Sequence, residues 1–222
     1  MDEKRERRQM LLIYVAIGVI VAVITGWFLY QNRMEFWETQ ARSAFRMALG
    51  EELQKRNEVD VYFSSSGNIR LPDNSIDIKK EPIKVRIESE YGVKDFFIPY
   101  EKHSHNIERS SDMRASYSYV LYKSPLQADS LNRIWYRLLE EMNYFGKTVV
   151  RISVADWDER ETYTFSDDSL YMLKPDSLMS CYLGYRCEIG VTGYLYYSWL
   201  NIFTAKDKIL LCALALCCFL LF

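Results

Sequence analysis

The stretch MLLIYVAIGVIVAVITGWFLY, Met10 to Tyr30, decides the architecture because it contains no charged residue. As a helix rising about 1.5 Å per residue it would span roughly 30 Å, the thickness of the hydrocarbon core of a bilayer. Basic side chains precede it and favour retention in the cytoplasm; they are Lys4, Arg5, Arg7 and Arg8. We therefore expect residues 1–9 to be cytoplasmic and residues 10–30 to form a transmembrane helix.

A cleaved signal peptide is the alternative interpretation of this start. The apolar run is long for such a peptide, and its exit, Gly26 to Tyr30, lacks a small-x-small cleavage site. An uncleaved anchor is therefore favoured, and the chain that follows it is expected outside the cytoplasm.

A second apolar segment, Ile209 to Phe222, is only about 21 Å long as a helix, which is short for a full crossing. Aromatic residues gather where the first segment ends and where the second begins, as at one membrane interface; they are Trp27, Tyr30, Phe36 and Trp37, then Tyr194, Tyr196, Tyr197, Trp199 and Phe203. For the Tyr194–Tyr197 group, a place in the domain core is an equally good alternative. We expect residues 206–222 to be a C-terminal transmembrane segment, short or truncated, and residues 31–205 to be an extracytoplasmic domain.

The pattern within that domain predicts an α+β fold, a mostly antiparallel sheet with two main helices. The first helix has an apolar stripe at helical spacing, Ala41, Ala44, Phe45, Ala48, Leu49 and Leu53. No proline or glycine separates Tyr30 from this stripe, so we expect one helix from the membrane segment to about Arg56. The second helix has the stripe Leu131, Ile134, Trp135, Leu138, Leu139 and Met142, with Asp129 or Ser130 as its cap and Gly146 at its end.

Alternation and β-branched or aromatic content predict the strands. They are Val59–Ser64, Ile83–Ile87, Val93–Ile98, Ala115–Tyr122, Thr148–Val154, Arg160–Phe165 and Leu170–Leu173. The stretch from Glu101 to Ser111 is polar and predicts a loop. A final hairpin from Cys181 to Ser198 is expected to turn at Thr192-Gly193.

The cysteines fall into two groups. Cys212, Cys217 and Cys218 lie in the terminal apolar segment and are interpreted as small apolar residues. Cys181 and Cys187 would lie in an oxidising compartment, where a disulfide persists, but a bridge between them requires a turn at Gly184. Two unpaired core thiols are the alternative.

The other polar clusters do not predict a metal or cofactor site. His103 and His105 form an H-x-H pair in a polar stretch with no third ligand, so a solvated loop is preferred to zinc. Carboxylates at Asp156, Asp158, Glu159 and Glu161 lack the spacing of a calcium loop and are interpreted as a charged hairpin tip.

No sequence motif of a known catalytic centre is present, so we expect a protein that is not an enzyme. The chain has 28 basic and 30 acidic side chains, and this near balance does not attract nucleic acid. We therefore expect no catalytic residues, no cofactor, no metal and no nucleic-acid partner.

The chain resembles the N-terminal half of bacterial membrane-anchored regulators, which have a membrane helix, a periplasmic α+β sensor domain and a second membrane helix. The resemblance lies in Asp129–Trp135 with the helix they open, and in Asp176–Leu178 and Tyr182–Glu188 through to Thr192–Tyr194. In that group a winged-helix or histidine-kinase output domain follows, whereas this sequence stops at Phe222. No ligand-contacting residue is carried over from the resemblance.

The resemblance implies a sensor or input domain of a signal-transduction or transcriptional regulator in the bacterial inner membrane, truncated before its output domain. The alternative is a membrane-tethered envelope protein that scaffolds or assembles a partner without signalling. Expected partners are the membrane and an unidentified periplasmic ligand or protein. A second copy of the chain, meeting the first through Phe36, Trp37 and Phe45, is weighed against burial of these rings in their own domain.

Overall fold

The computed structural model describes residues 2–57, 81–89, 92–144, 146–167, 171, 177–196, 203, 206–210 and 212–213, without the side chains of residues 2–12, 14, 15, 57, 88 and 89. The chain forms two compact units, Met1–Ala41 with Tyr197–Phe222, and Arg42–Tyr196. Helix α1, Asp2–Asn57, contributes residues to both. It continues without a break through residues 31–40, where the sequence has neither proline nor glycine.

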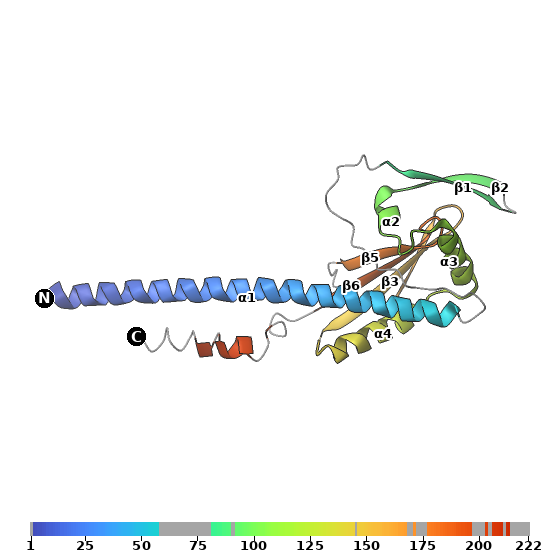
Figure 1. Ribbon diagram of the computed structural model, residues 1–222. Coiled ribbons are helices and arrows are strands. Elements are labelled where there is room, and N and C mark those ends of the chain that lie inside the picture. The colour runs from blue at the N-terminus through green and yellow to red at the C-terminus, as the bar shows by residue number, and fades with distance from the viewer. Residues whose placement is uncertain are drawn as a thin grey trace. The chain divides into compact units, whose positions relative to one another are not determined.

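The unit Arg42–Tyr196 has the α+β fold that the sequence predicts. Its larger sheet is antiparallel, with the strand order β4-β3-β6-β5 (Figure 1). The strands are β3 (Lys147–Ala155), β4 (Glu161–Phe165), β5 (Ser177–Leu183) and β6 (Ile189–Tyr196). Every residue of β6 from Ile189 to Leu195 is buried, so both faces of this central strand are covered.

The C-terminal part of α1 and helix α4 (Ala128–Glu141) pack on one face of the sheet. Phe45 of α1 and Trp135 of α4 meet edge to face with their ring centroids 4.8 Å apart, and both are fully buried. Gly193 of β6 lies against both rings, and a Cβ at this position would come within 2.9 Å of Phe45 and 3.1 Å of Trp135. The stripe predicted on the first helix is buried in full; its members are Ala41, Ala44, Phe45, Ala48, Leu49 and Leu53. Phe45 is thus buried within its own domain, whereas Phe36 is 50% exposed.

A buried carboxylate joins α1 to the start of α4. Glu52 is only 1% exposed; its Oε1 accepts a hydrogen bond from Arg56 at 2.7 Å, and its Oε2 accepts one from the Ser130 hydroxyl at 3.1 Å. Arg56 also donates to the carbonyl oxygens of Ser124 and Pro125. A buried carboxylate without partners would cost free energy, so Glu52 must keep these hydrogen bonds in the folded state. The cluster therefore fixes the end of α1 against the segment that precedes α4 and the first turn of α4.

A separate two-stranded antiparallel hairpin consists of β1 (Ile83–Ser89) and β2 (Gly92–Ile98). It is followed by the helices α2 (Tyr100–Ser104) and α3 (Ser111–Lys123). Figure 1 shows the hairpin on the side of the larger sheet away from α4. Phe96 of β2 is buried against the Trp157 ring at 5.2 Å, and Lys94 donates a 2.6 Å hydrogen bond to the Trp157 carbonyl. These contacts connect the hairpin to the turn between β3 and β4.

The prediction of a strand over Ala115–Tyr122 is wrong, because these residues belong to helix α3. The buried residues of α3 are Arg114, Tyr117 and Leu121, spaced three and four apart as on one face of a helix. Alternating tyrosines in this stretch mimic a strand, but Tyr119 and Tyr122 are exposed. The predicted loop from Glu101 to Ser111 likewise contains most of α2.

The predicted cap and end of the second main helix are also wrong. Helix α4 begins after Gln127, which makes no side-chain cap bond, and the Ser130 hydroxyl binds Glu52 instead. The helix ends at Glu141, well before Gly146. Asn143 adopts the left-handed conformation (φ 59°) just beyond the end, a role that asparagine tolerates better than most residues.

The expected turn at Thr192-Gly193 lies instead in the middle of strand β6. The β5–β6 connection turns between Leu183 and Ile189, where Gly184 has φ +89°. Gly193 marks a close approach of two aromatic rings rather than a turn. The predicted strand Val59–Ser64 lies outside the described residues, as does Leu170–Leu173 apart from Tyr171.

In the other unit, a ring contact and an ion pair join α1 to the C-terminal part of the chain. Tyr30 lies 6.2 Å from Phe203 between ring centroids, and Arg33 pairs with the buried Asp207 at 2.9 Å. Residues 206–210 and 212–213 are helical. Within the part of the chain searched, which is the described part, no helix is both long enough and apolar enough to cross a membrane.

Replacing Gly193 by alanine should destabilise the fold, because the new methyl group would press on Phe45 and Trp135. We expect the unfolding free energy to fall by about 1–3 kcal/mol, as for other overpacked cores. Gly50→Ala is the matched control, since a Cβ there meets nothing within 4 Å on an exposed helix surface. It should stabilise by about 0.5–1 kcal/mol. Denaturant unfolding of the full chain measures both, and equal effects of the two substitutions would contradict the packing described.

Candidate functional site

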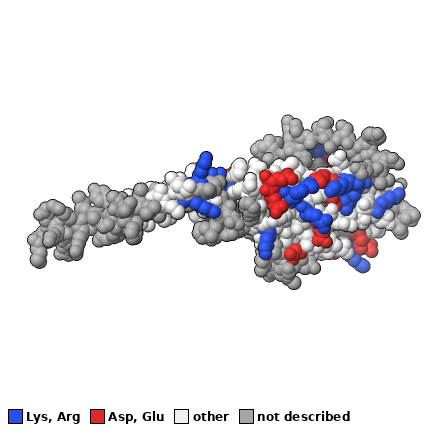
Figure 2. Space-filling view, turned by 90° about the horizontal axis from the view of Figure 1, so that it is seen from below, with Lys and Arg blue, Asp and Glu red and all other residues white. Residues whose placement is uncertain are grey.

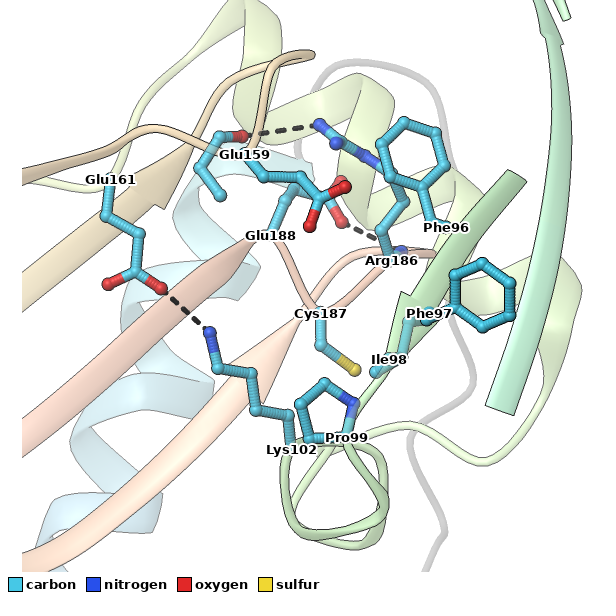
Figure 3. Close-up of a pocket in the computed structure, with 11 residues that line it drawn as sticks. Phe96, Phe97, Ile98, Pro99, Lys102, Glu159, Glu161, Arg186, Cys187 and Glu188 are labelled. Carbon is cyan, nitrogen blue, oxygen red and sulfur yellow. Dashed lines mark hydrogen bonds and ion pairs between the residues drawn. The ribbon is translucent and has the colours of Figure 1, made fainter. Parts of the chain in front are cut away.

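A pocket of about 240 Å³ lies where the end of β2, helix α2 and the β3–β4 and β5–β6 turns meet, all within the unit Arg42–Tyr196. Its lining consists of Phe96, Phe97, Ile98, Pro99, Lys102, Ala155, Glu159, Glu161, Arg186, Cys187 and Glu188. Figure 3 shows Phe96 and Ile98 of β2 along one side of the pocket, Glu161 on the opposite side and Arg186 and Glu188 between them. The pocket thus combines an apolar wall with charged groups of both signs.

Arg186 is the most firmly held charged group of the pocket. Its guanidinium stacks on the Phe96 ring at 4.6 Å and lies 5.8 Å from the Trp157 ring. It donates hydrogen bonds to the carbonyl oxygens of Asp156 at 3.0 Å and Ala155 at 3.3 Å. Stacking and two carbonyl acceptors hold the cation in one position, so it would lose little side-chain freedom on meeting a ligand.

Lys102 and Glu161 form an ion pair across the pocket at 2.8 Å (Figure 3). Burial is the largest single influence on the pKa of Lys102 and lowers it, but the hydrogen bond to Glu161 and the charge of that carboxylate, with Tyr182 and Tyr163, together raise the lysine pKa above its ordinary value. The hydrogen bonds from Lys102 and from the Tyr163 hydroxyl lower the pKa of Glu161. Both groups therefore remain charged through the neutral pH range.

Glu188 is bound by the turn that carries it. Its carboxylate accepts hydrogen bonds from the Arg186 main-chain N–H at 2.9 Å and from the Ser118 hydroxyl of α3. The Ser118 hydroxyl in turn accepts the N–H of Tyr185 at 2.7 Å. Gly184 makes room for this network, since a Cβ there would come within 2.4 Å of the Glu188 carboxylate. The glycine is needed both for this space and for its positive φ.

Backbone strain concentrates at the pocket. Among the described residues, the non-glycine positions with positive φ are Asn143, Glu159 and Cys187. Glu159 (φ 65°) and Cys187 (φ 56°) both line the pocket. A left-handed residue with a β-carbon costs about 1–2 kcal/mol. Strain of this kind is characteristic of binding and catalytic sites, where surrounding contacts hold it in place.

The structure places the two candidate disulfide residues in different surroundings, and both are free thiols. Cys181 of β5 is directed to the carbonyl oxygen of Val191, and burial raises its pKa to about 12. Cys187 lies in the β5–β6 turn and accepts a 3.2 Å hydrogen bond from the Asn106 side chain; burial raises its pKa as well. The turn at Gly184 that a disulfide requires is present, but the disulfide itself is not.

The two histidines do not face each other as a metal pair. His105 Nδ1 lies 2.8 Å from the carbonyl oxygen of Glu101, whereas His103 Nε2 meets the guanidinium of the buried Arg114. Burial lowers the pKa of His103, and the charge of Arg114 lowers it further. His103 must therefore be neutral to accept this hydrogen bond.

The acidic stretch from Asp156 to Glu161 lies in the β3–β4 turn and at the start of β4. Asp156 Oδ1 accepts the main-chain N–H groups of Asp158 and Arg160, which makes it a turn-forming residue. Among the described side chains, no three His, Cys, Asp or Glu residues are close enough to hold a metal ion.

The sequence does not predict this pocket: Glu159 and Glu161 belong to the stretch interpreted as a charged hairpin tip, and Cys187 is a candidate for a disulfide or a core thiol. Lys102 and Arg186 carried no signal, because no motif unites residues from such separate parts of the chain. Comparison of the chain with protein-family models, with curated proteins and with solved structures found no match.

The contact between His103 and Arg114 predicts a loss of stability in acid. His103 has a folded-state pKa below its ordinary value of 6.5, so its contribution is fully present above pH 6.5. This contribution should decline as the pH falls from 6.5 towards the folded-state pKa, because protonation removes the acceptor and places two cations together. Unfolding free energy measured against pH tests this.

In His103→Gln the amide oxygen still accepts from Arg114 but does not titrate, so this part of the pH dependence should disappear. His105→Gln is the control and should keep the wild-type profile. Identical profiles for wild type and His103→Gln would show that this contact does not respond to pH.

Proposed function

We propose that the chain is a membrane-anchored extracytoplasmic input domain of a bacterial signal-transduction or transcriptional regulator. The observation that carries the proposal is that the uncharged stretch Met10–Tyr30 and the buried stripe Ala41–Leu53 belong to one helix, α1. In this proposal the N-terminus is cytoplasmic, the inner membrane holds Met10–Tyr30, and the unit Arg42–Tyr196 is periplasmic.

Exposed apolar side chains on α1 support the membrane anchor. Six of them, Ile13, Ile17, Val23, Ile24, Trp27 and Phe28, are each between 52% and 65% exposed and share one broad face of the helix. The opposite face of Met10–Tyr30 adds no charged residue, so the segment is uncharged on all sides. A helix that is apolar on all sides requires an apolar environment, and lipid supplies one. The basic residues before Met10 favour the proposed orientation.

The contacts within the unit that contains both apolar segments support a return of the chain to the same membrane surface. Tyr30 contacts Phe203, and Arg33 pairs with Asp207, at the positions where the first segment ends and the second begins. Tyrosine and paired charges suit the polar boundary of a bilayer better than its interior. The C-terminal segment would then enter the membrane beside α1.

The pocket supports a binding role rather than a catalytic one. Its thiol, Cys187, has a raised pKa and is therefore a poor nucleophile. His103, which follows Lys102 in the chain, does not line the pocket, and its Nε2 is bound to Arg114. Figure 2 shows basic and acidic side chains interspersed on one face, and pairs such as Arg137 with Glu51 neutralise each other. Such a face does not attract a nucleic acid.

We propose that α1 transmits the signal. A ligand can shift the domain between two conformations only by as much as its binding free energy differs between them. A ligand in the pocket contacts the β5–β6 turn, and β6 lies against Phe45 of α1 through Gly193. A change in this packing would alter the part of α1 that is buried in the domain, and the same helix continues into the proposed anchor.

The proposed topology predicts the side from which the domain is digested. Protease added to spheroplasts should cleave within Arg42–Tyr196 and leave an N-terminal epitope tag intact, and the tagged fragment should stay with the membrane after an alkaline wash. Cleavage only in inverted vesicles, or recovery of the chain in the soluble periplasmic fraction, would contradict the proposal.

The proposed signalling role predicts that the pocket and the helix are coupled. We suggest fusing a DNA-binding domain that is active only as a dimer after Phe222 and measuring a reporter gene. Arg186→Gln should change reporter expression by about fivefold or more, the lower end of allosteric coupling. Combining it with Gln31→Gly and Asn32→Pro should abolish that change, because these residues break the helix.

The matched control replaces the same two positions by alanine, which keeps the helix and should keep the response. Immunoblots verify equal amounts of each fusion. No response to Arg186→Gln in an intact helix, or an equal response with the broken helix, would favour a scaffold without signalling.

A further inference from the structure

Among the described residues, the pocket contains one charge of each sign that has no ion-pair partner: the half-buried Arg186 and the exposed Glu159. Lys102 and Glu161 neutralise each other, and Glu188 accepts hydrogen bonds from Ser118 and from the Arg186 main chain. The partners of the Arg186 guanidinium among the described residues are neutral carbonyl oxygens and aromatic rings. Within the described part of the chain, neither Arg186 nor the Glu159 carboxylate has an ion-pair partner.

Arg186 is arranged to receive a carboxylate. A guanidinium has five N–H groups, and within the described part of the chain the two carbonyl contacts leave three of them available for an anion. The ring of Phe96 covers one face of the cation at 4.6 Å, so an anion is directed to the edge, where the N–H groups lie. Because Arg186 is half-buried and covered on one face by a ring, it gains more from a paired anion than a fully exposed arginine does.

Glu159 provides the complementary group for a cation. Its left-handed backbone (φ 65°) lies in the β3–β4 turn, and the carbonyl acceptors of Arg186 are at the end of β3 (Ala155) and the start of the same turn (Asp156). A ligand with only a carboxylate would meet three glutamates in this pocket, and one with only an ammonium would meet Lys102 and Arg186. A ligand that carries both groups satisfies both charges.

The remaining lining determines the size and polarity of the ligand. Phe96, Ile98 and Pro99 form an apolar wall on one side of the pocket, whereas the ring of Phe97 is exposed and points away from it (Figure 3). The volume of about 240 Å³ is below the range of roughly 300–1,000 Å³ for pockets of drug-sized ligands. We infer that this pocket binds a free α-amino acid with an apolar side chain, its carboxylate on Arg186, its ammonium group on Glu159 and its side chain against β2.

This inference names the ligand class for the proposed sensory role and rests on it, but its test is equilibrium binding and needs no signalling output. L-Leucine titrated into the full chain in detergent micelles should bind saturably, as measured by calorimetry. N-Acetyl-L-leucine lacks the ammonium group and L-leucinamide lacks the carboxylate, so each should bind at least about tenfold more weakly, the loss expected for a charge-assisted hydrogen bond.

Glu159→Gln should weaken leucine binding by at least about tenfold and abolish the difference in affinity between leucine and its N-acetyl derivative. Arg186→Gln should likewise weaken leucine binding and abolish the difference in affinity between leucine and L-leucinamide. Asp158→Asn and Arg160→Gln are the matched controls, since they remove the same charges from exposed neighbours that do not line the pocket. Glu159→Gln removes no contact within the described residues, so it tests the site even if Arg186→Gln does not fold.

Absence of saturable binding by leucine, isoleucine, valine, methionine and phenylalanine would overturn the inference, and so would equal affinity for leucine and both derivatives. Binding without any effect on the reporter fusion would support the pocket assignment and count against the sensory role. A reporter response to Arg186→Gln without amino-acid binding would count against the ligand and support the role.

Discussion

The close contact of Phe45 and Trp135 with Gly193 is the constraint on which the rest of the domain depends. The two rings meet at 4.8 Å over a strand position that has no room for a β-carbon. This contact joins α1, α4 and β6, which are far apart in sequence, and it buries the apolar stripe of α1. Because protein interiors are close-packed, a change at this contact must be shared by all three elements.

At the other end of the sheet the interactions are polar rather than apolar. Arg186 holds the β3–β4 turn through two carbonyl oxygens and the hairpin through the Phe96 ring. Glu188 holds α3 through Ser118. One turn, between β5 and β6, thereby organises the pocket, and the same strand β6 continues from that turn to Gly193. Strand β6 thus connects the pocket at its N-terminal end with the core that α1 and α4 cover.

Several features could be predicted because they depend on local periodicity. The buried faces of α1 and α4, the alternation of β1 and the strands β3 and β4 follow from residue spacing alone. The wrong predictions have a common cause. Glycine, serine and tyrosine each occur in more than one structural role, and the commoner role was predicted at positions where the fold uses the other. Gly193 serves a ring contact rather than a turn, Ser130 binds a buried carboxylate rather than capping its helix, and the tyrosines of α3 lie on a helix.

By itself the sequence determined the α+β class, the uncharged segment Met10–Tyr30 and the helix that continues to Asn57, because each depends on neighbours within a few turns of chain. It also identified the charged β3–β4 turn, but not its use. Only the tertiary structure brought Lys102, Glu159 and Arg186 into one pocket and left the two cysteines apart as free thiols. The physical reason is that such a site is made by chain segments meeting in space, and no spacing along the sequence records which segments meet.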